Sequence, residues 1–193
     1  MPRTQNRYVA TDYVSALLET VLDFRMHTTT VVRAMEHYNA YRWQELRTIE
    51  DLKACLARFP ADQDGDTALA LHLWGNRHWT RAHMLRGLTA FFDAQRIWSI
   101  ETLREWAVGS DFKRDFAGRV KGLGPTVYRW LVMRLGVETV KPDTHLHRFV
   151  EHTLGRTVSD DDVVAVVSAA ANRLGMRAYE LDSSIWEYQT ARR

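Results

Sequence analysis

A Gly-hydrophobic-Gly turn stands at Gly122, Leu123 and Gly124, between two stretches with helical apolar spacing. Pro125 follows at once, in the place of a first-turn helix proline. Such a turn lets two helices meet closely and directs backbone N–H groups outward beside a helix N-terminus, where they bind phosphate without reading base sequence. The same glycines are also compatible with a purely steric role, because glycine commonly ends helices.

A carboxylate follows this turn at Asp143, within the segment Lys141-Pro142-Asp143-Thr144-His145. One interpretation is an N-cap, since aspartate accepts hydrogen bonds from the first N–H groups of a helix. The other is catalytic, because a fixed carboxylate stabilises positive charge on a sugar or orients a water molecule. The two roles are compatible within one side chain. His145 and His147 alternate along the expected helix and do not share a face with each other, so no catalytic metal is expected.

Positive charge is concentrated around this region. Residues 112–156 contain nine Lys or Arg and four Asp or Glu, although the formal net charge of the whole chain is only +2. A second stretch, residues 67–92, has no acidic residue and carries three arginines and three histidines. Focused positive charge indicates a polyanionic partner, whereas the alternative is an ordinary solvated helix face.

The elements that must position these residues are helices, because the apolar spacing is helical almost throughout. We expect an all-α chain of about ten short helices, with Thr48, Ser99 and Ser159 as N-caps. The segment 61–66, ADQDGD, is expected to be a loop, and only residues 137–140 have a short strand-like pattern. Expected helical stretches are 11–25, 31–38, 49–59, 67–74, 80–95, 99–106, 159–174 and 181–188.

The composition excludes several classes of protein. With 193 residues, 46% of them hydrophobic and 26% charged, the chain has the composition of an ordinary globular protein. The single cysteine, Cys55, excludes an intrachain disulfide, a thiolate zinc site and a cysteine-ligated iron–sulfur cluster. A cytoplasmic location is expected, with no signal peptide and no membrane span.

The hairpin and the aspartate segment together resemble the helix-hairpin-helix (HhH-GPD) DNA glycosylase superfamily, the group of endonuclease III and the adenine and alkyl-base glycosylases. The matching residues are Val120, Gly122, Leu123, Gly124, Pro142, Asp143, Thr144, His145 and Arg148. A looser likeness extends over residues 10–155. The resemblance implies one two-lobed, all-α unit over residues 1–193. Its helical barrel lobe would span 28–140 with the hairpin at 112–135, and its second lobe would combine the N-terminal helix 8–26 with 143–193.

The function that the resemblance implies is that of a monofunctional DNA glycosylase in base excision repair. Asp143 would drive hydrolysis of the N-glycosidic bond of a flipped base, and the hairpin residues would bind phosphate. Relatives that also nick the strand carry a lysine at the position of Thr126, so no AP lyase activity is expected. The hairpin residues are Lys121, Gly122, Leu123, Gly124 and Thr126.

The implied partner is double-stranded DNA, bound by a monomer that is nucleoid-associated and makes no contact with a membrane. No cofactor, metal or iron–sulfur cluster is expected, apart from a monovalent cation at hairpin carbonyls around Leu123 when DNA is bound. Candidate base-pocket or wedge residues are Arg25, His27, Thr28, Arg77, His78 and Trp79. Helix packing is the alternative role for these side chains. Two other functions stay open: a non-catalytic helix-hairpin-helix DNA-binding protein, and a glycosylase-fold enzyme that acts on another N-glycoside.

Overall fold

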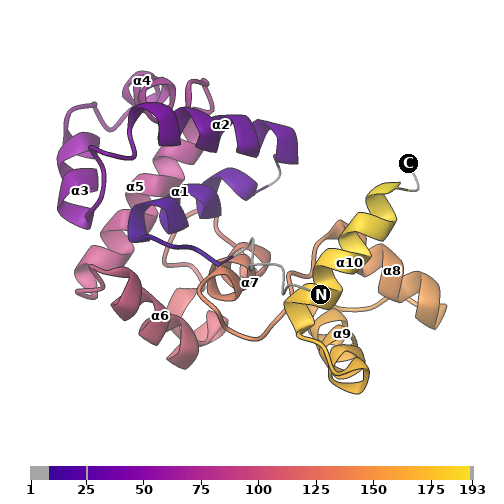
Figure 1. The fold of residues 1–193 in the computed structure, drawn as a ribbon. Helices are drawn as coiled ribbons and strands as arrows, with labels where there is room; N and C mark the ends of the chain where they lie inside the picture. Colours follow the sequence, from indigo (N-terminus) through magenta and orange to yellow (C-terminus); the bar gives the residue numbers. More distant parts are fainter. Residues whose placement is uncertain (1–8, 25, 192–193) are drawn as a thin grey trace. The chain divides into compact units, whose positions relative to one another are not determined.

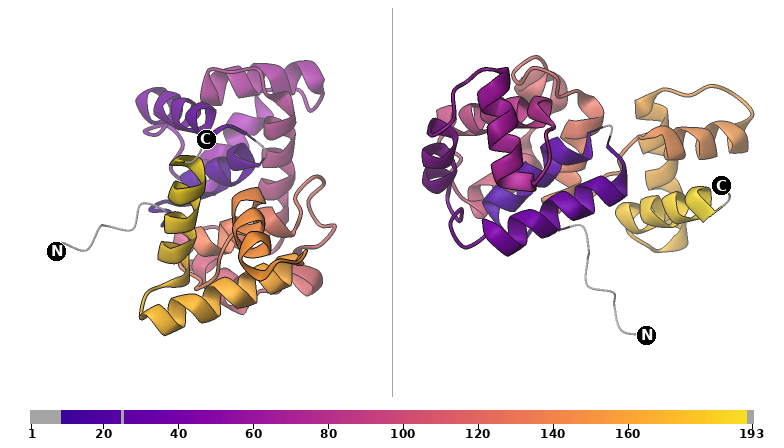
Figure 2. Two further views of the ribbon diagram at one scale, coloured as in Figure 1. Left: turned by 90° about the vertical axis from the view of Figure 1, so that its right-hand side faces the viewer. Right: turned by 90° about the horizontal axis from the view of Figure 1, so that it is seen from above.

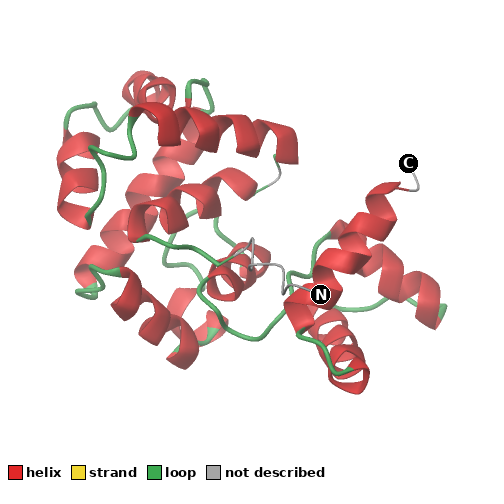
Figure 3. Cartoon of the chain, in the orientation of Figure 1, coloured by secondary structure: helices red, strands yellow, loops and turns green. Residues whose placement is uncertain are grey.

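The computed structural model describes residues 9–24 and 26–191, and these residues form eleven helices and no strand (Figure 3). The expected all-α class is confirmed, while residues 137–140 form a connecting segment. The helices are α1 Tyr13–Asp23, α2 Thr28–Tyr41, α3 Ile49–Ala57, α4 Gln63–Trp74, α5 Trp79–Ala94, α6 Ile100–Gly109, η1 Phe112–Phe116, α7 Pro125–Arg134, α8 Thr144–Leu154, α9 Asp160–Leu174 and α10 Ala178–Ala191 (Figure 1). No helix in the described ranges is long and apolar enough to cross a membrane.

The expected N-caps are confirmed. Thr48, Ser99 and Ser159 each accept the backbone N–H of the third helical residue, and in each case the side chain of that residue bonds back to the cap. These reciprocal bonds satisfy N–H groups that have no partner within the helix. Local sequence therefore determines where α3, α6 and α9 begin.

The loop expected at residues 61–66 is only partly correct, because α4 already begins at Gln63. Asp62 is the N-cap, and its carboxylate accepts the N–H of Gly65 at 2.8 Å. Gly65 lies in the first turn of α4 against the backbone of Pro60, where a side chain would clash with the Pro60 carbonyl. The glycine thus permits a close approach of two chain segments instead of marking a loop.

The chain divides into two compact units, and the boundary falls within α7, after Val127. The first unit is Ala10–Val127. Within it, α1 packs against α2, α3 and α5 (Figure 1). This grouping differs from the expectation that helix 8–26 joins the C-terminal segment. Nine of the eleven α1 residues are buried, including Ser15 and Thr20, so α1 is a central helix enclosed by its neighbours.

A buried ion pair ties together three helices of the first unit. Asp66 in α4 is 1% exposed and accepts a hydrogen bond from Arg86 Nε of α5 at 2.7 Å. The guanidinium also donates to the carbonyls of Leu56 and Phe59 at the end of α3, at 2.7 and 2.9 Å. One arginine therefore neutralises a buried carboxylate and satisfies carbonyl groups at a helix end.

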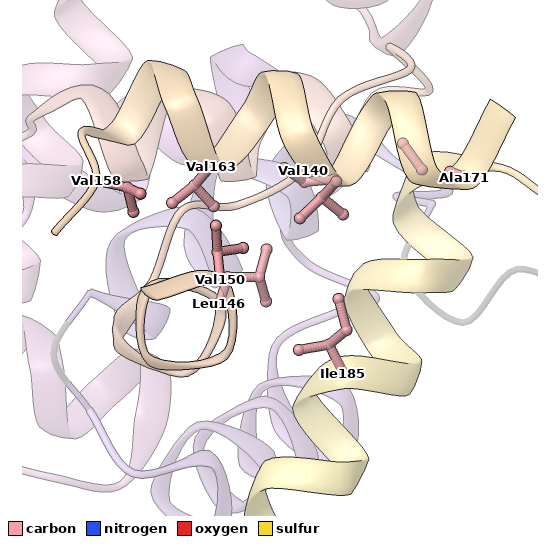
Figure 4. Close-up of a cluster of buried hydrophobic side chains, with 9 residues drawn as sticks. Val140, Leu146, Val150, Val158, Val163, Ala171 and Ile185 are labelled. Carbon is pink, nitrogen blue, oxygen red and sulfur yellow. The ribbon is translucent and has the colours of Figure 1, made fainter. Parts of the chain in front are cut away.

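The second unit, built from Val9 and residues 128–191 in the described chain, contains α8, α9 and α10 packed around one another (Figure 2). Its core is formed by side chains from all three helices and from Val140 and Val158, and Figure 4 shows Leu146, Val163 and Ile185 directed toward one another. The segment that leads to Asp143 is anchored by this core, because Val140 is fully buried in it.

Candidate functional site

The hairpin turn belongs to the first unit and has the backbone that its glycine predicts. Leu123 N–H donates to the carbonyl of Val120 at 3.2 Å, and Gly122 at the third position of this turn has φ +88°. That conformation is the left-handed region, which glycine adopts without strain. A side chain at Gly124 would meet no atom within 4 Å, so the backbone just before α7 is open to an approaching group.

The hairpin packs against one face of α5. A Cβ at Gly122 would lie 2.6 Å from the terminal methyl of Met84, and a Cβ at Gly87 would lie 3.1 Å from Val120 Cγ1. Val120 and Leu123 are buried, while Lys121 between them is exposed. The apolar residues therefore anchor the turn, and the lysine and glycine backbone stay at the surface.

A short helical element precedes the hairpin. It is the five-residue π-helix η1, whose Phe116 is buried and meets Phe91 of α5 edge-on at 5.3 Å between ring centroids. Aromatic packing on α5 holds this segment in place, and the turn then leads to α7 at Pro125.

The local excess of positive charge is only partly available at the surface. Arg114, Arg129 and Arg156 form ion pairs with Asp115, Asp161 and Asp162 respectively, and Arg134 is 4% exposed. Lys121, by contrast, is exposed and makes no ion pair with any described residue. Phosphate attraction at the hairpin therefore depends on fewer residues than the sequence count indicates.

In the first unit, the residue that precedes one set of candidate pocket residues contacts a residue that follows the other set. Arg81 of α5 donates a hydrogen bond to the carbonyl of Phe24, and its guanidinium lies 5.2 Å from the centre of the Phe24 ring. The end of α1 therefore lies against the start of α5. His27 and Thr28 are exposed at the start of α2, and Arg77 and His78 are exposed before α5, where Trp79 is half-buried. Arg25 lies outside the described residues.

In the second unit, Asp143 is the N-cap of α8. Its Oδ1 accepts the N–H groups of His145 at 2.8 Å and Leu146 at 3.1 Å. Its Oδ2 makes no hydrogen bond with the described part of the chain, and the side chain is half-buried. The capping interpretation is confirmed, and the cap uses one of the two carboxylate oxygens.

The two histidines after Asp143 point to different helices. His147 Nε2 lies 2.7 Å from Asp160 Oδ1 of α9, whereas the His145 ring meets Trp186 of α10 at 6.0 Å between centroids. Among the described residues, no group of three or more His, Cys, Asp or Glu side chains is arranged to hold a metal ion.

Asp182 of α10 is a site residue that the sequence analysis missed. It is 8% exposed, and its Oδ2 accepts the backbone N–H of Lys141 at 2.7 Å. Burial, and secondarily the negative charge of Asp143, raise the pKa of Asp182 to about 7. Asp182 lies four residues after buried Ala178 and three before buried Ile185, which places it on the apolar face of α10. A carboxylate on an apolar helix face is the sequence feature that could have identified it as a site residue.

Comparison with known proteins gives a family but no described activity. No curated protein and no solved structure matches the chain. A family model described as Domain of unknown function (DUF8548) matches residues 5–190. Because this match covers nearly all of the helices described above, the chain belongs to that family.

Proposed function

We propose that the protein is a monofunctional DNA glycosylase that flips a damaged or mispaired base and hydrolyses its N-glycosidic bond. The observation that carries the proposal is the state of Asp143: one carboxylate oxygen is fixed by two backbone N–H groups, and the other has no partner in the described chain. A carboxylate held in this way has a defined orientation and retains an oxygen for chemistry.

A glycosylase must also bind the DNA backbone, and we assign this role to the hairpin. Open backbone at Gly124, the start of α7 and the exposed Lys121 offer donors and positive charge to a phosphate. Contacts of this kind position a duplex without reading its sequence. Selectivity would come from the lower cost of extruding a damaged or mispaired base.

The reaction is a hydrolysis. The bond between C1′ of the sugar and the base nitrogen breaks, and its electron pair leaves with the base. The oxygen of one water molecule forms the new bond to C1′; one water proton stays on the new hydroxyl group and the other ends on the departing base. Asp143 stabilises the positive charge that develops on the sugar and orients the water. Thr126 has no amine, so it forms no imine with the sugar.

The test is excision from a panel of alkylated, deaminated, oxidised and mismatched duplexes, comparing the natural chain with Asp143→Asn. Asparagine keeps the cap, so α8 should persist, while abasic-site formation on the substrate duplex should fall by at least about 100-fold with DNA affinity retained. Asp62→Asn is the matched control, because it makes the same change at the N-cap of α4.

The other outcomes identify the alternatives. Duplex binding that weakens steeply with salt, without excision in either protein, would favour a non-catalytic DNA-binding protein. Absence of salt-dependent duplex binding would favour an enzyme that acts on another N-glycoside. Excision that is equally fast in Asp143→Asn would remove Asp143 from the mechanism.

A further inference from the structure

A small cavity lies in the first unit between α2 and the turn that joins α4 to α5. Its volume is about 260 Å³, and Thr30, Arg33, His37, Trp74, Gly75 and Asn76 contribute to its wall. Pockets for drug-sized ligands occupy about 300–1,000 Å³, so this one suits an ion or a single small group. It involves neither Asp143 nor the hairpin.

Hydrogen-bond donors dominate the polar part of this wall, and none of the described residues that line it is Asp or Glu. Trp74 is 2% exposed, and its Nε1–H is buried without an acceptor among the described residues. A buried donor left in this state is costly, so it favours a ligand that accepts a hydrogen bond. Arg33 adds a guanidinium that forms no ion pair with the described chain.

Asn76, which also lines the cavity, keeps a side-chain hydrogen-bond donor. Its side-chain oxygen accepts the backbone N–H of His78 at 3.1 Å, which leaves the amide NH₂ group for another partner. The residues that line the cavity therefore carry a guanidinium, a buried indole N–H without an acceptor and an amide NH₂. This set of donors matches the oxygens of an anion.

The carboxyl end of α4 also reaches this cavity, and helix carboxyl ends repel anions. Two of its last carbonyls are already engaged, however: Leu71 O accepts Gly75 N–H at 3.0 Å, and His72 O accepts Arg42 Nε at 3.0 Å. Gly75 has φ +66°, and a Cβ there would lie 2.8 Å from His37 Nδ1. The glycine thus lets the His37 ring lie against the turn.

We propose that this cavity is a binding site for a phosphate group. Phosphate offers several strong acceptor oxygens to the donors above and carries the charge that Arg33 complements. The exposed Arg77 and His78, which follow Asn76 directly, add further donors beside the cavity. The group is either the backbone phosphate of a nucleic acid or the phosphate of a free small molecule.

The experiment is a titration of the ¹⁵N-labelled full-length chain with inorganic phosphate, at constant ionic strength maintained with chloride. Backbone signals of Gly75 and Asn76 and the Trp74 indole N–H should shift together. Arg33→Gln should weaken phosphate binding at least about tenfold. Arg96→Gln, which removes the same charge from an exposed position in the α5–α6 turn, should leave it unchanged. Trp74→Phe removes the indole donor and should also weaken phosphate binding. If Trp74→Phe does not fold, the result for Arg33→Gln tests the proposal on its own.

Repeating the titration with an undamaged duplex identifies the source of the phosphate. A duplex that displaces inorganic phosphate indicates the DNA backbone, and a duplex without effect indicates a free phosphorylated molecule; both support the site. The proposal is overturned if millimolar phosphate shifts none of the three signals, or if Arg33→Gln and Arg96→Gln lose binding equally. Since the titration needs no catalysis, its failure is distinct from failure of the proposed glycosylase activity.

Discussion

The buried carboxyl group of Asp182 accepts the backbone N–H of Lys141 at 2.7 Å. The carbonyl of Lys141 in turn accepts the N–H of Asp143 at 2.7 Å. Helix α10 thereby holds the chain directly before the N-cap of α8. A carboxyl group from a distant part of the sequence thus fixes the backbone on which the candidate catalytic aspartate stands.

Asp182 should make the second unit less stable as pH rises. Its pKa in the folded chain is about 7, against an ordinary value of 3.8, so between these values the folded state keeps a proton that the unfolded state has released. Its contribution to stability is present in full below about pH 4, declines by at most about 1.4 kcal/mol per pH unit, and is lost above pH 7.

Asp182→Asn keeps an acceptor for Lys141 N–H but does not titrate. Urea unfolding from pH 4 to pH 8 should therefore show a smaller loss of stability with rising pH in the variant than in the natural chain. Equal pH dependence in the two proteins would show that the pKa of Asp182 is the same in the folded and the unfolded state.

Gly122→Ala should destabilise the first unit by about 1–2 kcal/mol, because alanine is strained at φ +88°. Its Cβ also meets the Met84 methyl, which must shift. Duplex affinity should fall as well, since the turn carries Lys121.

Denaturant unfolding and duplex binding, measured side by side, check both expectations for Gly122→Ala. Gly109→Ala is the matched control: a Cβ there meets nothing within 4 Å and the backbone is not left-handed, so stability should hold or rise slightly. Unchanged duplex affinity in a destabilised Gly122→Ala would separate the hairpin from DNA binding.

Arg86→Met should cost about 3–5 kcal/mol of unfolding free energy, because it leaves the Asp66 carboxylate buried without the arginine that pairs with it. The carbonyls of Leu56 and Phe59 lose donors at the same time. Arg177→Gln breaks an exposed pair with Glu138 and should cost less than about 1 kcal/mol. Similar losses in the two variants would contradict the assignment of Arg86 to the core of the first unit.

Borohydride should trap no covalent adduct between the protein and a substrate duplex, because Thr126 provides no amine beside the hairpin. The measurement is a denaturing gel after reduction during turnover, with an authentic lyase as the positive control. A trapped adduct that disappears in Lys121→Gln would show that this exposed lysine attacks the sugar and that the protein nicks the strand.

The local features of this chain follow from residues close together in sequence. The caps at Thr48 and Ser159, the turn at residues 122–124 and the cap at Asp143 are all predicted by patterns within four residues, because helix starts and tight turns are satisfied by neighbouring groups. The error at residues 61–66 arose because Gly65 makes a contact with Pro60 that the local sequence pattern does not contain.

Only the tertiary structure determined which of these helices and turns contact one another. Asp182 bonds to a backbone group 41 residues away, and Arg81 reaches the carbonyl of Phe24 across 57 residues. Packing of distant segments also determines that α1 lies against α5 and which arginines form ion pairs. The cavity at Trp74 arises in the same way. Helical periodicity predicts that a face is buried, but the partner of that face depends on how whole helices pack.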